Sequence, residues 1–229
     1  RQGRRLRMTD PLRLWRVFPW DPRAADGVPF SPSFVPQASG HGRFDLPHGL
    51  SPVAYLAESP AHAVAELIHP WRGRAIDDRH LTRAGLRLAV VEARFDAGDA
   101  QLADLCDPET LARLDLAPDR VASRRRPVTQ PIARRVWDSG AAGLRWWSRF
   151  WGDWHTTVVF TRRVEGAASG GGPAGGGAAA WSPAAERPGA GRPPAPALTF
   201  GDPTPLAIDH PAVEQAADAL GIARRVVRA

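Results

Sequence analysis

Several things are scarce in this sequence of 229 residues, and each scarcity excludes a class of protein. It contains one cysteine, Cys106, and no lysine. A single cysteine excludes an internal disulfide framework and a cysteine-based zinc site, and we expect a small buried thiol rather than a nucleophile. No segment approaches the roughly 20 apolar residues that span a bilayer, and the N-terminus lacks a signal-peptide hydrophobic segment. These absences predict a cytoplasmic protein without membrane contact.

Familiar short motifs are also missing. The sequence has no glycine-rich phosphate loop followed by Lys-Ser/Thr, no Gly-x-Ser-x-Gly turn and no His-Glu-x-x-His helix. Its seven histidines do not recur at the spacing of metal ligands. We therefore predict no metal site, and any active site must be assembled from residues that lie far apart in the sequence.

The positive charge is weaker evidence for a nucleic-acid partner than it first looks. The formal net charge is +6, but four arginines precede the only methionine, Met8, so a start at Met8 lowers the charge to +2. The Arg124–Arg126 cluster remains, and it either binds a polyanion or is a solvated loop. We predict no direct nucleic-acid contact and keep a basic interaction module as the alternative.

The hydrophobic pattern predicts an α+β domain with a compact mixed or antiparallel sheet and flanking helices. Ser59-Pro60 and Asp107-Pro108 both have the cap residue and first-turn proline that begin a helix. The expected strands are 12–18, 53–57, 86–95, 143–147, 155–161, 197–200 and 222–227. The other expected helices are 129–139 and 211–220.

The composition divides the chain into three segments. Residues 12–164 form the main part of the predicted domain, and residues 19–41 within it are a long irregular loop of the kind that often binds ligands. Residues 165–196 are so rich in Gly, Ala and Pro that we predict a disordered insertion. Residues 197–229 are expected to complete the same domain with a strand, a helix and a short final strand.

One acid stands out because of its surroundings. Glu66 interrupts an otherwise uncharged helical run, Ala61–Ile68. A carboxylate is costly to bury there without a partner. The sequence offers Arg43, in the Gly-Arg-Phe-Asp turn, as the best partner, with Tyr55 on the strand between them.

Five residues together suggest a chemistry, namely Arg16, Arg43, Tyr55, Glu66 and Ser148. Arginines hold phosphate oxygens in a planar fork, and a tyrosine stacks a flat ring or donates a hydrogen bond. A carboxylate can counter positive charge developing on a ribose carbon, and a serine hydroxyl can orient the glycosidic end. The set suits a dinucleotide with a labile N-glycosidic bond.

Each residue also has a structural reading. The Arg43–Glu66 pair can be a buried ion pair, Tyr55 can be a core residue and Ser148 can be a satisfied strand hydroxyl. Glu92 is a rival acid on the longest strand, although the neighbouring Arg87 and Arg94 give it a surface role. Residue types alone do not decide between the two readings.

The order of several short motifs resembles the RES domain family. The matching stretches are Leu14–Val17, Gly42–Phe44, Ala54–Pro60, Ala63–Glu66, Thr129-Gln130, Gly143–Ser148 and Ala216–Ile222. Each motif is weak alone, and their order is the specific feature. The resemblance covers roughly residues 12–162 and 197–227, and the bulky Trp146-Trp147 and Trp151–Trp154 segments depart from it.

The resemblance implies an NAD-degrading enzyme whose fold is similar to that of mono-ADP-ribosyltransferase toxins. Such enzymes cleave the nicotinamide–ribose bond, with water or phosphate as acceptor, and need no cofactor beyond NAD⁺ as substrate. It implies that Glu66 is catalytic, that Ser148 completes the site, that Arg16 and Arg43 contact the phosphates or ribose, and that Tyr55 lines the nicotinamide end.

The resemblance also implies a partner. RES proteins are the toxins of toxin–antitoxin pairs whose antitoxin is an Xre-like DNA-binding protein, and we expect such a partner, with a homodimer possible. Two alternatives stay open: ADP-ribosyl transfer to a protein, and a non-catalytic interaction module. The first predicts modified target proteins, and the second predicts salt-sensitive nucleic-acid binding without NAD turnover.

Overall fold

A computed structural model describes residues 11–37, 39–97, 101–148, 150, 153–164, 168–169 and 196–225. Within them a nine-stranded sheet has the order β11-β6-β1-β3-β9-β8-β7, with β5 and β12 also paired to β6. All of its pairs are antiparallel except β7–β8, which confirms the α+β prediction. The sheet strands are β1 (Leu12–Pro19), β3 (Val53–Ala57), β5 (Thr82–Arg83), β6 (Leu86–Asp96), β7 (Leu102–Asp104), β8 (Gly143–Trp147), β9 (His155–Phe160), β11 (Ala197–Phe200) and β12 (Thr204–Pro205).

Two short parallel pairs lie outside this sheet. They are β10 (Ala168–Ser169) with β2 (Phe34–Val35), and β13 (Ala223–Arg224) with β4 (Ala75–Ile76). The helices are α1 (Pro60–Ile68), α2 (Pro108–Arg113), α3 (Pro118–Ala122), α4 (Arg126–Asp138) and α5 (Pro211–Leu220), with 3-10 turns at His69–Trp71, Asp78–Leu81 and Thr161–Arg163. No helix in these ranges is long and apolar enough to span a membrane.

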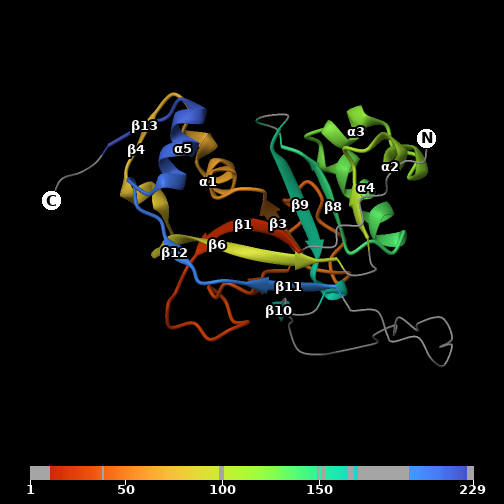
Figure 1. The fold of residues 1–229 in the computed structure, drawn as a ribbon, viewed down its shortest axis with the longest axis horizontal. Helices are drawn as coiled ribbons and strands as arrows, with labels where there is room; N and C mark the ends of the chain where they lie inside the picture. The colour runs from red at the N-terminus through yellow and green to blue at the C-terminus, as the bar shows by residue number, and fades with distance from the viewer. Residues whose placement is uncertain are drawn as a thin grey trace.

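Strands β1 and β3 are paired over a much shorter length than β1 and β6. Only Trp15 and Ala57 pair across this junction. Strands β1, β6 and β11 run across the molecule, whereas β8 and β9 rise away from them (Figure 1). Because paired residues share a face and side chains alternate, Trp15, Ala57 and Tyr55 lie on one face of the sheet, and Arg16 lies on the other.

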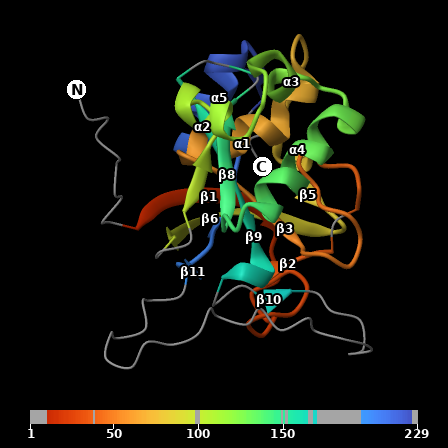
Figure 2. The ribbon, with the colours of Figure 1, turned by 90° about the vertical axis from the view of Figure 1, so that its right-hand side faces the viewer.

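All five helices cover the face that carries Trp15 and Tyr55, in two separate groups (Figure 1). Helices α1 and α5 pack on β1 and β6 through a cluster that includes Val64, Val213 and Leu88. Helix α4, with α2 and α3 beside it, packs on β8 and β9 through Ile132 and Val158. The opposite face carries the segment from Trp20 to Gln37 and the β2–β10 pair (Figure 2).

Local sequence explains the helix that carries Glu66. The Ser59 hydroxyl accepts a hydrogen bond from the His62 backbone N–H at 3.1 Å, and Pro60 occupies the first turn. The helix gives way to a 3-10 turn at His69-Pro70, because proline lacks the N–H needed to continue it. The predicted start of α1 at Ser59-Pro60 is confirmed.

Three boundaries differ from the predictions. The predicted 129–139 helix begins earlier, at Arg126, because Pro127 suits a first turn. The final strand predicted over 222–227 spans only Ala223–Arg224 among described residues, since β4 offers a partner of the same two-residue length. Within the predicted disordered insertion, 165–196, the two residues of β10 pair with β2; apart from these and Pro196, the insertion lies outside the described residues.

Candidate functional site

Glu66 lies on α1 one turn after His62, with its carboxylate Oε1 3.6 Å from the His62 Nε2. The Glu66 side chain is 38% exposed, whereas the His62 side chain is 1% exposed. The buried polar group of this helix is therefore the imidazole rather than the acid. That position leaves the carboxylate able to face a ligand.

Ser148 follows β8 and is brought to the same helix by the loop between β8 and β9. Its backbone N–H donates to the Trp154 carbonyl at 2.6 Å, and its hydroxyl accepts from the Phe150 N–H at 3.3 Å. The Trp154 ring lies 4.9 Å from the His62 ring. Ser148 and Glu66, eighty-two positions apart in sequence, are thus linked through two intervening side chains.

Arg43 lies under the second helical group. Its guanidinium donates to the Val121 carbonyl at 2.6 Å and lies 5.2 Å from the Phe44 ring centre and 5.7 Å from that of Trp146. Trp146 precedes Ser148 by two residues and so points to the same side of the chain. The expected Arg43–Glu66 pair is replaced by other partners for each residue, because α1 and the α3–α4 group lie over different parts of the sheet.

Tyr55 is held by the turn that carries Arg43. Its hydroxyl donates to Asp45 Oδ1 at 2.9 Å and accepts from the Phe44 N–H at 3.0 Å. Burial, followed by the nearby Asp45 carboxylate, raises the pKa of Tyr55 above its ordinary value. The hydroxyl is thus neutral, and its two hydrogen bonds stabilise the turn. The predicted contact of Tyr55 with nicotinamide stays a prediction.

The same turn depends on a glycine and on α4. A Cβ at Gly42 would lie 2.2 Å from both Tyr55 Oη and Asp45 Oδ1. From α4, Gln130 donates to the Gly40 and Gly42 carbonyls at 3.0 and 3.1 Å, and the Thr129 hydroxyl donates to the Arg43 carbonyl. The role of Asp45 was not foreseen from the sequence. The Thr129-Gln130 motif was the available signal for the contact with α4.

Arg16 is separated from the other four residues by the sheet itself. Its guanidinium donates to the Phe34 carbonyl at 3.0 Å and lies over the Phe18 and Phe200 rings at 5.0 and 5.7 Å. Burial lowers its pKa to about 10. In this position Arg16 holds the start of β2 against the sheet. Its predicted role as a phosphate ligand stays a prediction.

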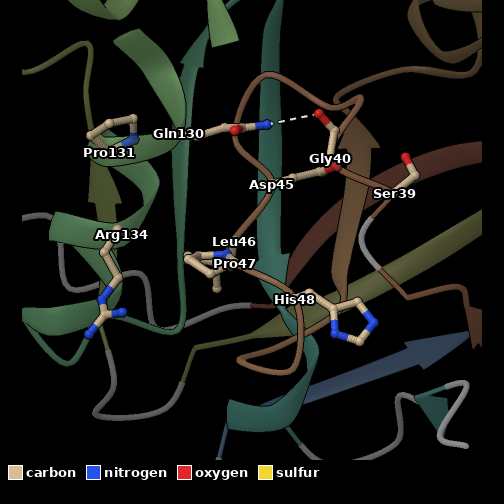
Figure 3. A pocket seen from close by; sticks show the side chains of 9 residues that line it. All are labelled: Ser39, Gly40, Asp45, Leu46, Pro47, His48, Gln130, Pro131 and Arg134. Carbon is tan, nitrogen blue, oxygen red and sulfur yellow. Dashed lines mark hydrogen bonds between the residues drawn. The ribbon is translucent and has the colours of Figure 1, made fainter. Parts of the chain in front are cut away.

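A cavity of about 470 Å³ opens beside the Arg43 turn, between the 39–48 segment and α4 (Figure 3). Gln130 and Asp45 line it, but Arg43, Glu66 and Ser148 do not. A second cavity, of about 370 Å³, lies beside Leu67 and Trp71. Both openings are next to the candidate residues rather than between them.

Other reactive groups have structural partners. Glu92 accepts from Arg13 at 2.6 Å and from Arg94 at 3.1 Å, and the hydrogen bond from Arg13 lowers its pKa. Burial raises the pKa of Cys106 to about 12, which keeps its thiol protonated. Among the described residues, no three His, Cys, Asp or Glu side chains gather where they could hold a metal.

An ion-pair cluster was not foreseen. Arg145 pairs with Glu58 and Asp104 at 2.8 and 3.1 Å, and His155 lies 3.0 Å from the second oxygen of Glu58. Because Arg145 and His155 alternate with Trp146 and Thr156 across β8 and β9, this cluster lies on the face of the sheet opposite Trp146. It is distinct from the candidate site.

The structure is a mixed α+β domain whose helical face carries Arg43, the partly exposed acid Glu66 and the buried Ser148. The RES domain family model matches residues 13–182. The chain therefore belongs to the RES domain family.

Other comparisons add little to this assignment. One matching solved structure is that of the M. tuberculosis MbcT–MbcA toxin–antitoxin complex, with 16% sequence identity, a TM-score of 0.49 and 90% of each chain covered. No curated protein matches the chain.

Proposed function

We propose that this protein cleaves the nicotinamide–ribose bond of NAD⁺ and acts as the toxin of a toxin–antitoxin pair. The observation that carries the proposal is the packing of the β8–β9 loop on α1, through Trp154 and His62. That contact joins the loop between Ser148 and Trp154 to the helix that carries Glu66, and the sequence resemblance matches these two residues to the serine and glutamate motifs of the RES family. Arg43, in the arginine motif, has its guanidinium 5.7 Å from the ring centre of Trp146, two residues before Ser148.

The chemistry suits these side chains. When the C1′–N bond breaks, its electron pair returns to the pyridine nitrogen, so nicotinamide leaves as a neutral molecule without a general acid. Positive charge develops on the ribose carbon, and the fixed carboxylate of Glu66 stabilises it. A water or phosphate oxygen then bonds to that carbon. The Arg43 guanidinium supplies the planar fork that phosphate or ribose oxygens accept from.

The decisive test is incubation of the purified protein with NAD⁺, with and without phosphate, followed by mass spectrometry. We expect free nicotinamide together with ADP-ribose when water is the acceptor, or its 1″-phosphate when phosphate is. A Glu66→Ala protein purified in parallel is the matched blank. Undiminished turnover by folded Glu66→Ala would contradict the catalytic role of Glu66. ADP-ribose on added proteins would instead favour the transferase.

The toxin role has its own test. Induced expression of the wild-type chain should lower cellular NAD⁺ and stop growth, and Glu66→Ala should do neither. Co-expression of a small Xre-like reading frame from beside the gene should restore growth. Growth arrest with unchanged NAD⁺ would contradict the proposed link between toxicity and NAD loss.

A further inference from the structure

The imidazole of His62 is an unusual occupant of the core of α1. Its side chain is 1% exposed, and neither ring nitrogen has a hydrogen-bond partner among the residues that the structure describes. Roughly nine in ten buried polar groups in native proteins have such a partner. An unsatisfied buried polar group lowers stability, so packing alone would favour phenylalanine here.

The geometry directs this imidazole at Glu66. The two residues are one helical turn apart, and Nε2 lies 3.6 Å from Oε1. That separation is too long for a hydrogen bond, but a small rotation of the glutamate side chain would close it. His62 itself has little freedom, because its backbone N–H is fixed by the Ser59 cap and its ring lies against that of Trp154.

We propose that His62 is a positioning residue that orients the Glu66 carboxylate for catalysis, an inference that rests on the proposed NAD⁺ cleavage. With its proton on Nε2, the neutral imidazole donates to Oε1 when the substrate enters and turns the acid toward the ribose carbon. A hydrogen bond to a charged acceptor is strong, and the Trp154 ring packs against the imidazole that donates it. His62 acts through Glu66 and does not itself contact the substrate.

The role of Nε2 can be separated from packing by three substitutions. His62→Gln places an amide N–H near the position of Nε2, His62→Asn places one near Nδ1, and His62→Phe keeps the ring without a donor. We expect Phe and Asn to lower kcat about tenfold to hundredfold, with little change in KM, and Gln to retain most activity. His48→Phe, at an exposed histidine, is the control and should match the wild type.

A second readout does not depend on turnover. In ¹⁵N NMR of histidine-labelled protein, the His62 resonance should show the Nε2–H tautomer and should shift in Glu66→Gln. A thermal melt of each variant identifies any that fail to fold. The Nδ1–H tautomer would overturn the proposal, even if the Phe variant were too unstable to assay.

The kinetic outcomes are also distinguishable. Equal losses in the Gln, Asn and Phe variants would indicate packing and overturn the positioning role, as would unchanged kcat in folded His62→Phe. A wild-type protein that does not cleave NAD⁺ would instead defeat the proposed function. In that case the NMR measurement still decides which ring nitrogen of His62 carries the proton, and so whether Nε2 can donate to Glu66.

Discussion

The two halves of the candidate site differ in how fully their polar groups are satisfied. In the segment from Gly40 to Asp45, the Tyr55 hydroxyl makes two hydrogen bonds and α4 donates to three backbone carbonyls. At the contact between α1 and the β8–β9 loop, the His62 imidazole is buried and has no hydrogen-bond partner within the described part of the chain, and Glu66 is partly exposed.

This contrast indicates that the Arg43 turn serves stability and that the contact between α1 and the β8–β9 loop serves activity. A turn whose backbone carbonyls and tyrosine hydroxyl are hydrogen-bonded is stabilised by these contacts, so substitutions there should reduce the free energy of unfolding. A region with an unsatisfied buried polar group is less stable than a fully hydrogen-bonded one, and such a loss is expected where side chains bind a ligand. Substitutions at the helix–loop contact should therefore reduce activity and leave stability nearly unchanged.

The largest effect is expected for Glu66→Gln. Removing a charge that stabilises a transition state typically lowers kcat by about 10²–10³-fold, and a partly exposed side chain contributes little to folding. Turnover of NAD⁺ and the urea midpoint should be measured together. Glu109→Gln, at an acid on α2, is the matched control. A large stability loss in Glu66→Gln would remove the contrast between the two halves.

Gly42→Ala should have the next largest effect, on stability. The added Cβ would lie 2.2 Å from the Tyr55 hydroxyl and from Asp45, so both side chains must move. Overpacking of this kind costs about 1–3 kcal/mol, measurable by urea denaturation. In Gly201→Ala, the matched control, the nearest atom would be 3.8 Å away. An unchanged urea midpoint in Gly42→Ala would show that the turn is not rigid.

The sequence predicted most of the fold because the signals were local. Cap residues followed by proline marked α1 and α2, and hydrophobic runs marked β1, β3 and β6. Short elements such as α3 and β7 were missed, since their formation depends on neighbours distant in sequence. Helix α3 begins at Pro118 without a side-chain cap, and β7 is a three-residue strand that needs β8.

The site was less predictable, because proximity across the sheet depends on register. The Arg43 turn contacts Tyr55 and the Thr129-Gln130 motif, whereas Arg16 lies on the opposite face. The single Trp15–Ala57 pair decides that separation. A shift of one residue would reverse the facing of Arg16, and no local pattern reveals it. His62 was passed over because a buried histidine is recognisable only from its surroundings.

Arg43→Lys tests whether a residue of the Arg43 turn also contacts the substrate. The guanidinium donates to Val121 and lies over two aromatic rings, and lysine keeps the charge but loses the planar fork. We expect KM for NAD⁺ to rise about tenfold, equivalent to about 1.4 kcal/mol, with a smaller change in kcat. Arg113→Lys, on α2, is the control. An unchanged KM would argue against a contact between Arg43 and the phosphates or ribose.

The smallest effect is expected for Tyr55→Phe, which removes one oxygen from the turn. The Phe44 N–H and Asp45 Oδ1 would each lose a partner. Because a typical hydrogen bond contributes about 1 kcal/mol net, urea denaturation should reveal a loss of that size, with kcat and KM nearly unchanged. If turnover fell while stability held, the hydroxyl would be serving the substrate rather than the turn. Tyr55 would then belong with Glu66, on the functional side of the comparison.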